Sequence, residues 1–155
     1  MPSEPRLILS LFDRLTDNNP KATKEVPPNE WQLLADLKSG IAHDLTNLLN
    51  TRISEDDIPQ EFSEIRDSIL AYGVQDFAVS PLDRESIKQS IERSIRVFEP
   101  RLSRVKVEWL ESHSSALKLH YRIWAFLRAD YGNQPLVFDA ELPAETRQFK
   151  VNADR

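Results

Sequence analysis

The apolar pattern changes at Pro100, and this change divides the chain into a helical part and a strand part. Up to Phe98, apolar residues recur at helical spacing, whereas from Val105 to Trp109 they alternate with charged residues. Proline disfavours the helical conformation of the residue before it, so the last helix ends at Glu99. Helices followed by strands predict an α+β fold, with N-terminal helices and then a small, mostly antiparallel β-sheet of three to four strands packed on the helices.

Four helical segments are expected before Pro100. The first is a short helix on the stripe Leu7, Leu11 and Leu15. The second begins behind Pro27-Pro28, where Asn29 and Gln32 form a capping-box pattern. Its apolar stripe comprises Trp31, Leu34, Ile41, Leu45, Leu48 and Leu49, and Gly40 is a point at which it can be split.

The third and fourth helices are bounded by proline and glycine. The third is expected between Pro59 and Gly73, because glycine suits the left-handed position after a helix. The fourth is expected to start at Ser80-Pro81, with proline in the first helical position. The faces predicted to be buried are Phe62, Ile65, Ile69 and Tyr72 in the third helix, and Ile87, Ile91, Ile95 and Phe98 in the fourth.

Three further strands follow the one at 105–109. Residues 117–127 alternate, and their second half is apolar on both sides, which predicts a central strand. Residues 136–142 and 147–151 are separated by the turn sequence Pro-Ala-Glu-Thr and form an expected antiparallel hairpin. We therefore expect two regions, a short helix and linker over 1–28 and a single α+β domain over 29–155.

Composition excludes several classes of function. The 155 residues contain no cysteine, which removes disulfides, Cys-ligated zinc and a cysteine nucleophile. The three histidines have no i, i+4 pair, and three glycines leave no phosphate-binding loop, so we expect no metal and no cofactor. A net charge of −5 disfavours a nucleic-acid partner. No signal peptide and no apolar run of about 20 residues is present, which favours a cytoplasmic protein without direct membrane insertion.

Glu99 is an unusual residue for the end of a helix. A negative charge there opposes the helix dipole at a cost of about 0.3 to 1 kcal/mol. One interpretation is an intramolecular ion pair with Arg96 or Arg101. The other is that Pro100 makes a rigid corner from which Glu99 and Arg101 offer an acceptor pair and a planar set of donors to a partner. The residues alone favour the ion pair.

Several runs resemble a known family in the right order along nearly the whole chain. They are Leu-Phe-Asp-Arg-Leu at 11–15, Asp-Leu-Thr-Asn-Leu-Leu-Asn-Thr-Arg at 44–52, Ser-Ile-Leu-Ala-Tyr-Gly at 68–73, Phe-Glu-Pro-Arg-Leu at 98–102, and the closing strands from Val137 to Val151. Together they resemble the TssE family of type VI secretion baseplate subunits. That family is similar to the small wedge subunit of contractile phage tail baseplates, which was historically labelled lysozyme-like.

The resemblance implies a structural, non-enzymatic part of the baseplate. It implies a protein that joins a wedge built with TssF, TssG and TssK to the first ring of the TssB/TssC contractile sheath, in the cytoplasm at an apparatus docked on the inner membrane. The Glu-Pro-Arg motif of the family falls on Glu99, Pro100 and Arg101, and the resemblance implies that it helps hold the wedge together. With this resemblance, the partner-binding interpretation of the corner becomes the preferred one.

The resemblance also implies a sheath that grows by strand exchange between neighbouring subunits. A protein that starts such a sheath needs a sheet edge with unpaired N–H and C=O groups. We therefore expect the C-terminal hairpin to accept sheath strands. The residues assigned to this pairing are Leu136, Val137, Phe138, Phe149 and Val151.

Two alternative functions follow from the same resemblance. The first is peptidoglycan hydrolysis. Glu4 and Asp13 match the first spacing of the phage-lysozyme pattern of Glu, Asp and Thr, but Asn19 occupies the threonine position. The second is a cytosolic anti-adaptor regulator, because a regulator of sigma-factor proteolysis shares this fold. A turbidity assay on cell walls tests the first, and a pull-down distinguishes the second.

Overall fold

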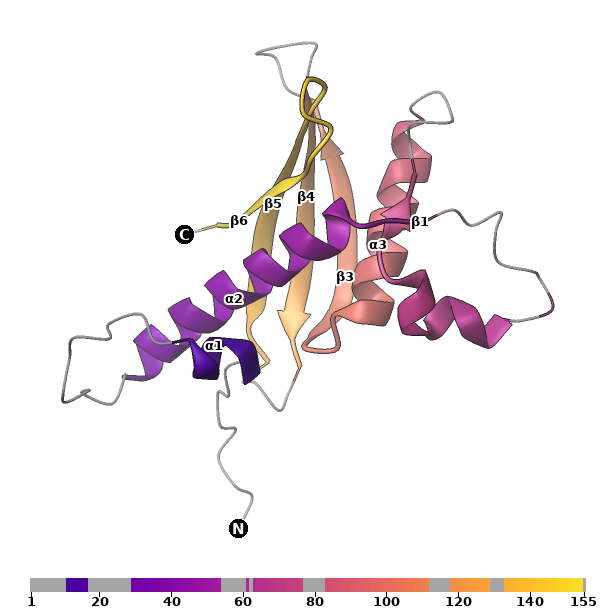
Figure 1. Cartoon of the computed structure of the whole chain (residues 1–155). Coiled ribbons are helices and arrows are strands. Elements are labelled where there is room, and N and C mark those ends of the chain that lie inside the picture. The colour runs from indigo at the N-terminus through magenta and orange to yellow at the C-terminus, as the bar shows by residue number, and fades with distance from the viewer. Residues whose placement is uncertain are drawn as a thin grey trace.

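The structure is a computed structural model that describes residues 11–16, 29–53, 61, 63–76, 83–111, 118–128 and 133–154. Two long helices are followed by a four-stranded sheet, as expected for the α+β class (Figure 1). The elements are α1 (Leu11–Leu15), α2 (Glu30–Asn50), β1 (Arg52–Ile53), the 3-10 turns η2 (Ser63–Asp67) and η3 (Ile69–Ala71), β2 (Val74–Gln75), α3 (Arg84–Phe98), β3 (Leu102–Leu110), β4 (Lys118–Leu127), β5 (Pro135–Pro143) and β6 (Lys150–Ala153).

Helix α2 begins at the predicted capping box. The Asn29 side chain accepts from the Gln32 N–H at 2.8 Å, and the Gln32 side chain accepts from the Asn29 N–H at 3.0 Å. The helix runs without a break through Gly40 for 21 residues, so the possible split does not occur. Its buried face comprises Leu34, Leu37, Ile41, Ala42, Leu45, Leu48 and Leu49.

Trp31 does not belong to this buried face, although it was predicted there. Its side chain is 81% exposed, although the i, i+3 spacing places it on the same side of α2 as Leu34, because it lies in the first turn of the helix, before the first buried residue. The prediction of a buried apolar face was therefore correct from Leu34 onward and wrong for Trp31 in the first turn.

The helix predicted between Pro59 and Gly73 is wrong for the described part of that segment. Residues 63–71 form two short 3-10 turns, and Ile69, expected in the buried face, is 83% exposed. Phe62 lies outside the described residues. Gly73 has φ +134°, and a Cβ atom there would lie 2.5 Å from the Thr51 carbonyl oxygen. Glycine is therefore required by the close approach of β1 to β2, and it follows the short 3-10 turn η3 instead of the predicted helix.

Helix α3 starts three residues later than predicted. Its N-cap is Asp83, whose carboxylate accepts from the Glu85 N–H at 3.1 Å, so the first helical position is Arg84, and Ser80 and Pro81 lie outside the described residues. The predicted apolar face is otherwise correct, since Ile87, Ile91 and Ile95 are at most 1% exposed. The Asp83 carboxylate satisfies one of the N–H groups that the first turn of a helix leaves without a partner inside the helix.

The sheet has the strand order β3-β4-β5-β6, and every neighbouring pair is antiparallel. Strand β4 is central, as predicted, and β5 and β6 form the predicted hairpin. Strand β3 carries a bulge between Ser103 and Lys106, where Arg104 has φ +52°. Such a bulge bends the strand locally and increases its twist.

Both long helices cover one face of the sheet (Figure 1). Helix α2 packs mainly beside β6, and α3 packs mainly beside β3. The alternate strand residues that face the helices, including Tyr121, Ile123 and Phe138, form one core with them and with Phe149 just before β6, each of these four at most 1% exposed. Burying each such side chain contributes about 1.5 to 3 kcal/mol, so the core fixes the strand register.

The first described segment is short. Within α1, the side chains of Leu11 and Leu15 are 70% and 76% exposed. Leu7 of the predicted short helix and residues 17–28 of the predicted linker lie outside the described residues. None of the helices in the described ranges combines the length and the apolar character that a membrane span requires.

Candidate functional site

The predicted corner forms a tight turn between α3 and β3. Glu99 is the C-cap of α3, and its N–H donates to the Ile95 carbonyl at 2.9 Å. The Leu102 N–H donates to the Glu99 carbonyl at 3.1 Å, which closes the turn over Pro100 and Arg101. Pro100 is exposed at the tip. The turn therefore brings the side chains on both sides of the proline toward each other.

Arg101 joins two carboxylates from different elements. Its Nε and Nη2 donate to the two Glu99 carboxylate oxygens at 2.7 and 2.5 Å, and Nη2 also donates to Asp44 Oδ2 at 2.5 Å. The Arg101 backbone N–H adds a bond of 3.2 Å to Glu99 Oε1. Asp44 comes from the middle of α2, so the network ties α2 to the end of α3 and the start of β3. A bidentate guanidinium–carboxylate pair has fixed geometry and is strong for its kind.

Burial differs sharply among the three charged groups. The side chains of Glu99 and Arg101 are 5% and 12% exposed, and that of Asp44 is 42% exposed. Burial acts to lower the pKa of Arg101, but the hydrogen bonds and charges of Glu99 and Asp44 outweigh it and raise the pKa above its ordinary value. The guanidinium is therefore charged at every accessible pH and compensates the buried carboxylate.

Tyr72 borders the same network. Its ring packs edge-on against Phe98, with the ring centroids 5.4 Å apart. Burial, followed by the negative charges of Asp44 and Glu99, raises the pKa of the Tyr72 phenol. Sequence reasoning did not identify Tyr72 or Asp44 as part of the site. The available signal for Asp44 was an acid directly before Leu45, at the border of the apolar stripe of α2.

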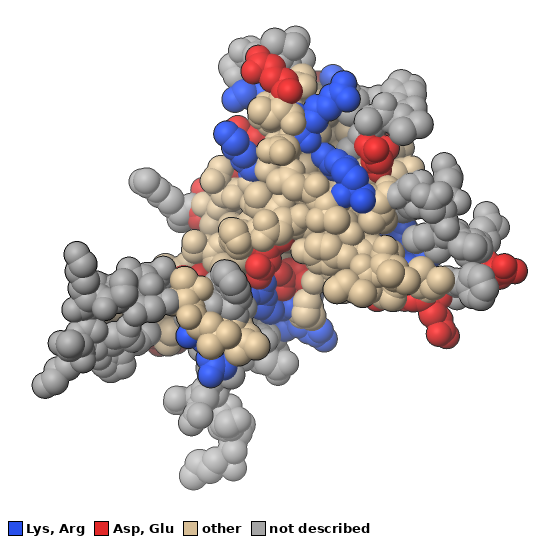
Figure 2. All heavy atoms as spheres, viewed as in Figure 1, with Lys and Arg blue, Asp and Glu red and all other residues tan. Residues whose placement is uncertain are grey.

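The intramolecular ion pair considered for Glu99 is present, and its partner is Arg101. Arg96 is directed to Glu92 instead, at 3.9 Å. The Glu99 carboxylate consequently faces the protein, and the parts of the corner that reach the surface are Pro100 and Asp44. Acidic and basic atoms meet near the centre of the face that carries α2 and α3, with uncharged surface around them (Figure 2). Binding of a partner at Glu99, Pro100 and Arg101 stays a prediction.

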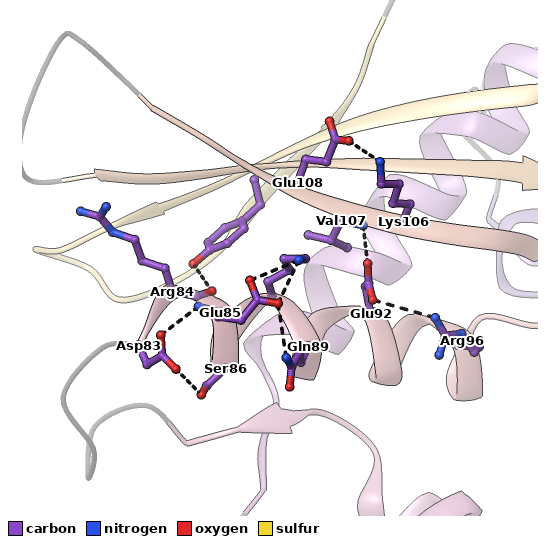
Figure 3. Close-up of polar contacts among 12 residues, drawn as sticks. Asp83, Arg84, Glu85, Ser86, Gln89, Glu92, Arg96, Lys106, Val107 and Glu108 are labelled. Carbon is purple, nitrogen blue, oxygen red and sulfur yellow. Dashed lines mark hydrogen bonds and ion pairs between the residues drawn. The ribbon is translucent and has the colours of Figure 1, made fainter.

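The two outer strands of the sheet differ in how their outward backbone N–H and C=O groups are protected. Strand β3 is covered by α3, and Glu92 Oε1 accepts from the Val107 backbone N–H at 2.8 Å (Figure 3). That N–H points away from β4, toward the edge. Lys106 on the same strand pairs with Glu108 at 2.7 Å. A helix across the edge together with charged side chains is a recognised protection against foreign strands.

Strand β6 leaves part of its edge free. The Asp154 N–H donates to the Val137 carbonyl of β5 at 2.9 Å. In an antiparallel pair the backbone groups of alternate residues face the partner strand, so those of Lys150, Asn152 and Asp154 face β5. The N–H and C=O groups of Phe149, Val151 and Ala153 therefore face away from β5. Asn50 holds the outward groups of Phe149, with bonds of 2.9 and 2.7 Å. For Val151 and Ala153, no outward backbone partner occurs among the residues that the structure describes.

The residues assigned to sheath pairing therefore fall into two groups. Leu136, Val137 and Phe138 lie on β5, which is paired with β4 along its length, and Phe138 is also paired with Ala153 of β6. Val151 lies on the outer strand, and Phe149 directly precedes it. Only the second group borders an open edge. Pairing of any of them with a sheath stays a prediction.

The described residues contain no group of three or more His, Asp or Glu side chains placed to hold a metal ion. Glu4 and Asn19 of the lysozyme-like spacing lie outside the described residues. The chemistry that the site does offer is hydrogen bonding and charge pairing at the corner, and backbone pairing at β6.

Comparison with known proteins identifies the family. The family described as baseplate wedge protein gp25 matches residues 35–131, which is more than half of the chain. The match includes Asp44 and the Glu-Pro-Arg corner and ends before β5 and β6. No curated protein and no solved structure matches the chain. The resemblance seen in the residue runs is confirmed at the level of the family, and the chain belongs to the baseplate wedge protein gp25 family.

Proposed function

We propose that this chain is the TssE-type subunit of a type VI secretion baseplate. In this role it links a wedge of TssF, TssG and TssK to the TssB/TssC sheath and starts sheath assembly, without enzymatic activity. The observation that carries the proposal is a difference between the two outer strands: Glu92 of α3 bonds the outward Val107 N–H of β3, whereas the outward groups of Val151 and Ala153 on β6 have no partner among the described residues. A chain that only had to fold would benefit from protecting both edges.

The sheath side of the proposal rests on β6. An incoming strand would pair with the outward N–H and C=O groups of Val151 and Ala153 and extend the sheet by one strand. Asn50 limits where such a strand begins, because its amide already occupies the outward groups of Phe149. The hairpin supports β6 from the other side through its pairing with β5.

A proline at Ala153 tests this contact. The Ala153 N–H faces away from β5, so Ala153→Pro removes an outward donor and leaves the β5–β6 bonds in place. We expect sheath assembly on reconstituted baseplates to be lost while the melting temperature is nearly unchanged. A proline within Leu136–Phe138 is a poorer test, because β5 lies inside the sheet.

Ala144→Pro is the matched control. Ala144 is exposed in the turn between β5 and β6, directly after Pro143, and this position accepts proline more readily than a strand does. This variant should assemble sheaths as the unchanged chain does. Normal sheath assembly with Ala153→Pro would refute strand addition at β6.

The wedge side of the proposal rests on the corner. Arg101 locks α2 to the α3–β3 turn, so Pro100 and Asp44 are presented on a rigid surface. The double variant Glu99→Gln with Arg101→Met removes both charges without leaving one of them unpaired in the interior. We expect it to lose co-purification with TssF and TssG while remaining folded.

The control for this double variant is another ion pair of the same kind. Arg122 Nε lies 2.9 Å from Asp139 Oδ1 on the face of the sheet away from the helices, and Arg122→Met with Asp139→Asn removes that pair. This control should retain wedge binding. Wedge binding by the Glu99 and Arg101 double variant would refute a role of the corner. Clearing of a cell-wall suspension by the purified chain would refute the non-enzymatic assignment.

A further inference from the structure

A groove of about 680 Å³ runs between α2 and β6. On the helix side it is lined from Trp31 to Thr46, and on the strand side it is lined by Val151 to Asp154, where β6 has its open edge. The lined stretch of α2 is about 22 Å long at 1.5 Å per residue. About seven residues of extended chain span that length.

Several of the α2 side chains that line the groove are small. Ala35, Ser39 and Ala42 follow one another at helical spacing, with Ala35 and Ser39 exposed beside the buried face of α2 and Ala42 at its border. Small side chains at these positions leave room beside β6 for the side chains of another chain. At one end, the indole of Trp31 is 81% exposed and offers a large apolar contact.

Lys38 supplies a charge to the same wall. It is half-buried in the groove lining, and no ion-pair partner for it occurs in the described part of the chain. A lysine held in this way favours an acidic side chain on whatever occupies the groove.

We propose that the groove selects the side-chain pattern of the strand that adds to β6. The occupant is an extended segment of a partner protein that pairs with Val151 and Ala153, and its alternate residues point toward α2. Those groove-facing residues are apolar and of medium size, to fill the space over Ala35 and Ser39. An acidic residue faces Lys38, and an apolar residue at one end packs on Trp31.

This inference rests on the proposed strand addition at β6 and extends it. The free edge alone would accept any extended chain, because backbone groups carry no sequence information. The groove adds a criterion on alternate side chains. A strand shifted by one residue would direct its polar side chains into the groove and its apolar ones into water.

The test attaches a trial strand to the full chain. An Asn-Gly turn and a strand of about six residues, alternating Val and Thr, follow the C-terminus, so that the strand folds back antiparallel on β6. In one version the valines face the groove, and in the other the pattern is shifted by one residue. We expect the first version to raise Tm by about 4 °C and the shifted version to leave it unchanged.

Two variants locate the effect. Ser39→Phe fills the floor of the groove and should abolish the gain in Tm, because Ser39 is exposed there and takes no part in the edge of β6. Trp31→Ala should reduce the gain. Trp124→Ala is the matched control, since Trp124 is 42% exposed on the opposite face of the sheet and should leave the gain intact.

The outcomes separate the two proposals. An equal rise in Tm for both patterns would overturn selection by the groove and leave strand addition at β6 standing. No rise for either pattern would overturn selection and also contradict strand addition. Dimerisation of the unextended chain that Ser39→Phe abolishes would show that a second copy occupies the groove, and would overturn the assignment to a partner strand.

Discussion

Replacing Arg101 by methionine tests the central ion network most severely. The side chain of Glu99 is 5% exposed and takes three of its hydrogen bonds from Arg101. Arg101→Met keeps only the backbone bond and leaves a buried carboxylate without its cation. Removing one partner of a buried ion pair costs about 3 to 5 kcal/mol. For a domain of this size, that corresponds to a fall in Tm of about 10 °C.

The double variant Glu99→Gln with Arg101→Met separates charge from packing. It removes both charges, so its free energy of unfolding should lie within about 1 to 2 kcal/mol of that of the unchanged chain. Urea unfolding followed by circular dichroism gives the free energies of unfolding of the unchanged chain, of Glu99→Gln, of Arg101→Met and of the double variant, which together form a double-mutant cycle. A cost below about 1 kcal/mol for Arg101→Met, or a double variant no more stable than the single one, would refute the reasoning. Arg122→Met, at a more exposed ion pair, should cost less than about 1 kcal/mol.

Three further predictions concern stability. Gly73→Ala should cost more than about 1 kcal/mol in urea unfolding, because φ is +134° and the new Cβ atom would approach the Thr51 carbonyl to 2.5 Å. Burial raises the pKa of Tyr121 to about 12 from 10.0, so stability is fully present below pH 10 and falls by about 1.4 kcal/mol per pH unit from pH 10 to pH 12. Tyr121→Phe should remove the part of the fall in unfolding free energy between pH 10 and pH 12 that comes from this phenol. Asn50→Ala should cost about 1 to 3 kcal/mol and speed hydrogen exchange of the Phe149 amide, which loses its acceptor.

Each of these has a contradicting result. An alanine at Gly73 that leaves the urea midpoint unchanged would show that the approach of β1 to β2 is not tight. Parallel loss of stability above pH 10 in the unchanged chain and in Tyr121→Phe would show that this phenol does not report on folding. Slow exchange of the Phe149 amide in Asn50→Ala would show that another group holds it.

The fold could be predicted from sequence wherever a regular period met a buried surface. The stripe from Leu34 to Leu49 and the alternation in 118–127 both identified their elements, because each period matches one face of the core. The segment before Gly73 misled for a physical reason. Its apolar residues have helical spacing, but the segment packs through Ala71 and Val74 and leaves Ile69 exposed.

The site was predictable only in part. The Glu99 to Arg101 corner was found, because a proline after an acid at a helix end is a local signal. Asp44 was missed, since it joins the corner across 57 residues of sequence. The difference between the two sheet edges was also beyond reach, because Glu92 meets Val107 and Asn50 meets Phe149 only once helices and strands have packed. Tertiary contacts of this kind leave no period in the sequence.

Hydrogen exchange at β6 tests the central claim most directly. The Val151 and Ala153 amides face the open edge, whereas the Phe149 amide is already bonded to Asn50 and serves as an internal reference. In the isolated chain, we expect the Val151 and Ala153 amides to exchange much faster than that of Phe149. In a reconstituted baseplate carrying its first sheath ring, they should become as protected as the reference. Amides of Val151 and Ala153 that still exchange rapidly in that assembly would contradict the account.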